Sequence, residues 1–120
     1  MTKHTLAAAL HLAYQVAARD GFQEEETWVL AQEMQSFNLP ADVQEEVLHL
    51  YRSMPFEDAV AYIRDADEAT KDEANALMML TMFNDRVVDP SEVEAYQHIR
   101  QLCGITRTLS IPDARSILGI

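Results

Sequence analysis

Apolar residues recur every three to four positions along most of this chain, which is the spacing that gathers them on one face of an α-helix. The first such segment predicts an amphipathic helix over about 4–19, with an apolar stripe made by Leu6, Leu10, Ala13 and Ala17. Its apolar stretch loosely resembles the core of a signal peptide, but His11 and Gln15 interrupt it. We therefore favour a helix of the folded domain over a cleaved signal.

The same periodicity predicts six further helices, over about 23–37, 41–53, 55–66, 69–84, 90–103 and 112–118. The segment 78–83 is rich in methionine and apolar nearly all round, which is typical of a central buried helix. An adaptable binding groove is the alternative interpretation of such a run. Residues 105–111 are the only stretch that could form a strand, and we expect a loop there.

Helix start and stop signals agree with these segments. Asp89 can cap a helix that opens with Pro90, and Glu92 then falls in its first turn. Gly104 suits the left-handed residue that ends this helix, and Asn38 suits the same role after residue 37. The prediction is an all-α fold, a bundle of about seven helices in a single domain spanning 1–120.

The charge balance is strongly acidic, with 20 Asp and Glu against 9 Lys and Arg and a net charge of −11. Such a chain repels nucleic acid and anionic membranes, so we expect a divalent cation or a basic protein surface as partner. No apolar run approaches the roughly 20 residues of a membrane span. The single cysteine, Cys103, excludes an intrachain disulfide and agrees with a cytoplasmic location.

An internal repeat links two parts of the chain. When Glu26 is laid on Glu92, Asn38 meets Gly104 and the hydrophobic residue that follows each of them also coincides. Upstream, Asp20 meets Asp85 if the first turn is one residue shorter. The repeated unit is a helix, an acidic turn and a second helix, and it predicts two pseudo-symmetric halves around a shared core.

The first acidic turn, Asp20-Gly21-Phe22-Gln23-Glu24-Glu25-Glu26, resembles the signature of TerB-like domains of the tellurite-resistance superfamily. The second turn, 85–92, matches that spacing better but has Arg86 where the family usually has glycine. The resemblance covers about 5–105. It implies a helical bundle of the TerB type, an association with stress or tellurite in some relatives, and a cation site at the acidic turns.

The acids of these turns allow two interpretations. Clustered carboxylates are ligands for a hard cation such as calcium, whereas acids at a helix start also stabilise the helix dipole and cap its free N–H groups. The candidate metal ligands are Asp20, Glu24, Glu26, Asp85, Asp89 and Glu92. Neither turn is an EF-hand, because the twelfth position of each loop is Ala31 or Tyr96 instead of glutamate.

Other candidate chemistry is sparse. Glu46 and His49 have the Glu-x-x-His spacing of di-iron bundles, but Glu94 and His98 are four apart, so the second pair is missing. We expect the histidines, including His4 and His11, to be solvated. Cys103 ends a helix, where the dipole disfavours a thiolate, so we expect it in the core.

These observations predict a non-enzymatic TerB-like binding or adaptor domain with no catalytic residue and no resident cofactor. In the preferred hypothesis, a divalent cation neutralises the two acidic turns and shifts the helix packing. In the second, the domain binds a basic protein surface without metal. A carboxylate-bridged metal enzyme is the third.

Overall fold

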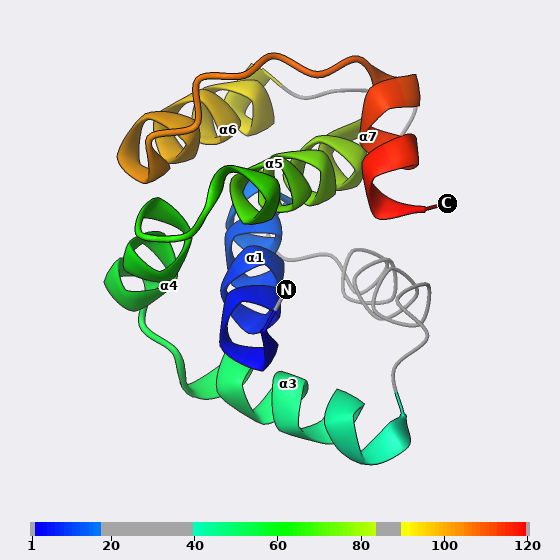
Figure 1. Cartoon of the computed structure of the whole chain (residues 1–120). Helices are drawn as coiled ribbons and strands as arrows, with labels where there is room; N and C mark the ends of the chain where they lie inside the picture. Colours follow the sequence, from blue (N-terminus) through cyan, green and yellow to red (C-terminus); the bar gives the residue numbers. More distant parts are fainter. Residues whose placement is uncertain (1, 18–39, 84–89, 120) are drawn as a thin grey trace.

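Residues 2–17, 40–83 and 90–119 are the part of the chain that this computed structural model describes. They form six helices and no strand: α1 (Lys3–Ala17), α3 (Ala41–Ser53), α4 (Phe56–Arg64), α5 (Glu68–Phe83), α6 (Pro90–Cys103) and α7 (Ile111–Leu118) (Figure 1). The predicted all-α class is confirmed. The helix predicted over 23–37 lies outside the described residues, so the count of seven and the pseudo-symmetric pairing stay predictions.

The ends of α6 and α7 show why the sequence breaks where it does. After α6, Gly104 adopts a positive φ of 67°, its N–H donates to the carbonyl of Gln101, and the Ile105 N–H donates to that of Arg100. This is the Schellman arrangement, which satisfies the last carbonyls of the helix. At the start of α7, Ser110 and Asp113 form a capping box that closes the free N–H groups.

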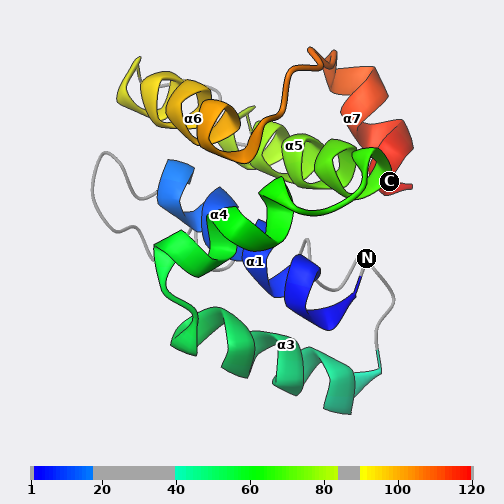
Figure 2. The same cartoon turned by 60° about the vertical axis from the view of Figure 1, so that its left-hand side comes forward.

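Helix α1 lies at the centre of the bundle, with other helices packed around it. Helices α3, α4, α5 and α6 all contact α1, and the two views show it enclosed by its neighbours (Figures 1 and 2). The helix is confirmed, and its apolar surface is wider than the predicted stripe, although His4, His11 and Gln15 remain on a less buried side. Small side chains explain the difference, because they let several helices approach at once: Ala7, Ala8, Ala9 and Ala13 are all fully buried.

Helix α5 is the second core helix, as the methionine-rich run predicts. Ala74, Leu77, Met78 and Met82 are buried along it. Thr81 is also buried, and its hydroxyl donates to the carbonyl of Leu77 at 2.8 Å, so burying it leaves that donor satisfied.

The remaining helices cover this pair. Val47 of α3 and Ile63 of α4 are fully buried, and α7 packs on α5. The segment between α6 and α7 has no strand, as expected, and it buries Ile105 and Leu109 against the core. One hydrophobic cluster thus joins all six described helices.

A buried polar cluster joins α5, α6 and the segment that follows α6. Asn75 is fully buried; its side-chain oxygen accepts from the Tyr96 hydroxyl at 2.6 Å, and its amide donates to the Arg107 carbonyl at 3.0 Å. The Arg107 carbonyl also accepts from Arg100 at 2.9 Å, and the Arg107 side chain bonds Asp72 at 2.6 Å. Because Asn75 satisfies one donor and one acceptor, it fixes the register of α5 against α6.

In the described part of the chain, no helix combines the length and the apolar character that a membrane crossing requires.

Candidate functional site

Five of the six residues predicted to bind a cation lie outside the described residues: Asp20, Glu24, Glu26, Asp85 and Asp89. The two acidic turns can therefore not be compared in space, and the cation site stays a prediction.

The sixth residue, Glu92, lies in the first turn of α6 and is only 4% exposed. A carboxylate at that position interacts favourably with the positive end of the helix dipole. Glutamate is seldom this buried unless other groups compensate its charge. Its position agrees with both interpretations of the acidic turns.

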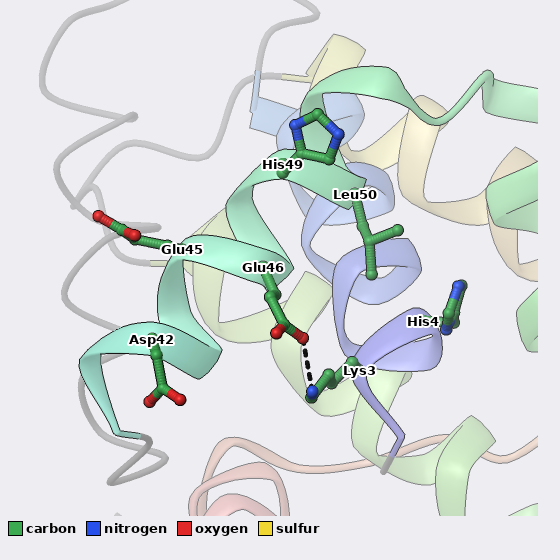
Figure 3. A pocket seen from close by; sticks show the side chains of 7 residues that line it. All are labelled: Lys3, His4, Asp42, Glu45, Glu46, His49 and Leu50. Carbon is green, nitrogen blue, oxygen red and sulfur yellow. Dashed lines mark hydrogen bonds and ion pairs between the residues drawn. The ribbon is translucent and has the colours of Figure 1, made fainter.

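Three of the described acids line an open groove of about 640 Å³ between the start of α1 and α3 (Figure 3). Three carboxylates, two imidazoles, one amine and one apolar side chain line it: Asp42, Glu45, Glu46, His4, His49, Lys3 and Leu50. The α3 residues share this groove because positions three and four apart lie on one side of a helix.

The side chains of this groove do not converge on a point. Glu46 turns toward Lys3 and forms an ion pair with it, while Glu45 and His49 extend in different directions (Figure 3). Within the described residues, no group of three or more His, Cys, Asp or Glu could hold a metal ion. The Glu46–His49 pair thus has the di-iron spacing without the cluster that such a site needs.

A second hollow, of about 530 Å³, lies on the other side of the first turn of α1. Residues of α4 and of the turn after it line it together with Thr5: Asp58, Ala61, Tyr62, Asp65 and Ala66. The two hollows adjoin at an aromatic contact, because His4 of the first lies with its ring centroid 5.6 Å from that of Tyr62. Tyr62 is nevertheless 41% exposed.

The environment of His11 differs from the one expected from the sequence. We expected it to be solvated, but its Nε2 is shut away from solvent and has no hydrogen-bond partner among the described residues. Its ring lies near those of Tyr51 and Phe56, at centroid distances of 6.0 and 6.4 Å. Burial lowers the pKa of His11, and the backbone of Tyr51 opposes that change. Periodicity missed this because His11 borders the apolar stripe, and its aromatic neighbours come from α3 and α4, which pack on α1.

Cys103 behaves as the sequence predicts. It is fully buried at the end of α6, and burial raises the pKa of its thiol to about 11. A thiol of that pKa is almost entirely protonated at neutral pH and is a poor nucleophile.

No family model matches the chain, and no curated protein does. Among solved structures, a protein of unknown function from Porphyromonas gingivalis W83 is similar, with a TM-score of 0.80 and 23% sequence identity over 100% of this chain and 91% of that chain. At this identity the likeness shows a shared fold alone.

Proposed function

We propose that this chain is a non-enzymatic, TerB-like binding or adaptor domain that responds to a divalent cation such as calcium. The carboxylates of its two acidic turns repel one another in the absence of the cation, and neutralising them shifts the packing of the helices that they join. The proposal includes a cytoplasmic location and a link to stress or tellurite resistance, both of which come from the family resemblance and the cysteine usage.

The observation that carries this proposal is the repetition of acids at equivalent helix starts, Asp20 with Asp85 and Glu26 with Glu92. Helix capping accounts for the same residues without a cation, so the experiment must separate the two.

Calcium, magnesium and manganese should be titrated into the pure protein while heat release and melting temperature are followed. The Asp20→Ala/Asp85→Ala variant should lose the response, whereas Glu68→Ala/Glu94→Ala, which removes two exposed acids outside the turns, should keep it. The absence of any change at millimolar metal, or an unchanged response in the Asp20→Ala/Asp85→Ala variant, would refute the cation site.

The second candidate is a domain that binds a basic protein surface without metal. The described surface favours it, because Asp42, Glu45 and Asp58 are exposed and form no ion pair with any described residue. Binding of this kind weakens as salt screens the charges. Capture of a partner that is lost at high salt and unaffected by a chelator supports this candidate, and capture that a chelator abolishes supports the cation.

A further inference from the structure

The surface around the first turn of α1, which we call the α1 face, consists of the two adjoining hollows and the His4–Tyr62 contact between them. Helices α1, α3 and α4 all contribute to it, and the His4–Tyr62 contact connects the linings of its two hollows. We propose that the α1 face is the docking site for a Lys- and Arg-rich segment of another protein. This inference builds on the binding role proposed above and does not depend on the cation.

The charge of the α1 face is one-sided. Five carboxylates line its two hollows, from Asp42, Glu45, Glu46, Asp58 and Asp65, against the single amine of Lys3. Lys3 is already engaged by Glu46, and Asp65 by Arg64. The other three carboxylates, on α3 and α4, are exposed and form no ion pair with a described residue: Asp42, Glu45 and Asp58.

The spacing of these carboxylates fits a ligand with several separate positive charges better than a single metal ion. The carboxylates of α3 point apart (Figure 3), and no described group could enclose a metal ion. Asp58 lies in the second hollow, beyond the His4–Tyr62 contact. A partner that reaches both hollows must carry several positive charges along its length, as a basic peptide segment does.

The uncharged residues of the α1 face suit the aliphatic parts of a basic peptide segment. Leu50 lines the first hollow, and Ala61, Tyr62 and Ala66 line the second. Lysine and arginine lay their aliphatic stems on apolar surface while their charged ends reach carboxylates. The exposed face of Tyr62 also offers a guanidinium a cation–π contact. Arginine is therefore preferred over lysine next to Tyr62.

The test uses a fluorescein-labelled peptide of four Arg-Ala repeats, followed by anisotropy in 25 mM NaCl with a chelator present. Glu45→Gln/Asp58→Asn should weaken binding roughly three- to tenfold, as expected for the loss of two exposed charge pairs. The matched control is Glu68→Gln/Glu94→Gln, which removes the same charge from exposed positions outside the α1 face and should change binding less than about twofold. Tyr62→Ala should weaken binding of the arginine peptide more than that of the matching lysine peptide.

Equal weakening by the two double variants would overturn the proposal, because the net charge and not the α1 face would then attract the peptide. Spermine that binds as tightly as the peptide, with the same dependence on Glu45 and Asp58, would overturn it in favour of a small polyamine. The absence of binding at low salt would also overturn it. Since the chelator is present throughout, none of these results bears on the cation response, and loss of the cation response leaves the α1 face untouched.

Discussion

The hydrogen bond between Tyr96 and Asn75 gives the sharpest test of how the structure holds together. The Tyr96→Phe change removes the hydroxyl that donates at 2.6 Å and leaves the side-chain oxygen of Asn75 buried without that donor. A buried hydrogen bond and an orphaned polar atom together cost about 1–3 kcal/mol. We expect a loss of that size in the free energy of unfolding.

The Asn75→Ala change removes both bonds of the amide and leaves a small cavity, so we expect a loss of about 2–4 kcal/mol. The Arg107 carbonyl keeps its bond from Arg100, and the Tyr96 hydroxyl loses the acceptor that Asn75 supplies. In the double variant that hydroxyl is absent too. The double variant should therefore be little worse than Asn75→Ala alone, so the coupling energy should be about 1–3 kcal/mol, the cost of Tyr96→Phe itself.

Urea unfolding followed by far-ultraviolet circular dichroism measures these energies, and a loss of 2 kcal/mol should lower the midpoint by about 1 M if the slope is near 2 kcal/mol per M. Ser53→Ala is the control. The Ser53 hydroxyl bonds the His49 carbonyl at 2.8 Å on an exposed surface, so its loss should cost less than about 0.5 kcal/mol. Losses that simply add in the double variant would refute the proposed contact between the two side chains.

Three further outcomes are expected. Cys103 should react with a disulfide reagent at pH 8 far more slowly in the native protein than in urea, because its thiol is buried and its pKa is about 11; equal rates would contradict its burial. Burial lowers the pKa of His11 in the folded state. As the pH falls below about 6.5, the unfolded chain binds a proton at His11 more readily than the folded protein does, so the free energy of unfolding decreases. Unfolding free energies at pH 7.5 and 5.5 should therefore differ less in His11→Phe than in the parent, and an unchanged difference would count against this. Gly104→Ala should cost about 1–2 kcal/mol in the same urea assay because the φ of Gly104 is 67°, and an unchanged stability would contradict this backbone conformation.

Helix position and type could be predicted from the sequence because local signals define them. Pro90 and Gly104 mark the two ends of α6, and the structure confirms both. The environment of α1 could not be predicted in the same way. Alanine contributes little to a hydrophobic pattern because its side chain is small. Whether an alanine is buried depends on which helices pack against it. That information lies in the whole fold.

The same limit applies to polar residues. Nothing local distinguishes Asn75 from an exposed asparagine, since its partners, Tyr96 and Arg107, are 21 and 32 residues away along the chain. The α1 face was missed for a related reason. His4 and Tyr62 meet only because α1 and α4 pack together, and an acid-rich sequence does not reveal which of its acids share a surface.

The central position of α1 has a consequence for how the chain is made. The ribosome synthesises α1 before any of the helices that cover it. Leu12 and Val16 are fully buried in the finished fold, but they lack these covering helices until the later helices have been made. Its contacts with α5 and α6 join parts of the chain that are synthesised far apart in time. The core around α1 therefore cannot be completed until α5 and α6 have been synthesised, and the apolar side chains of α1 stay exposed until then.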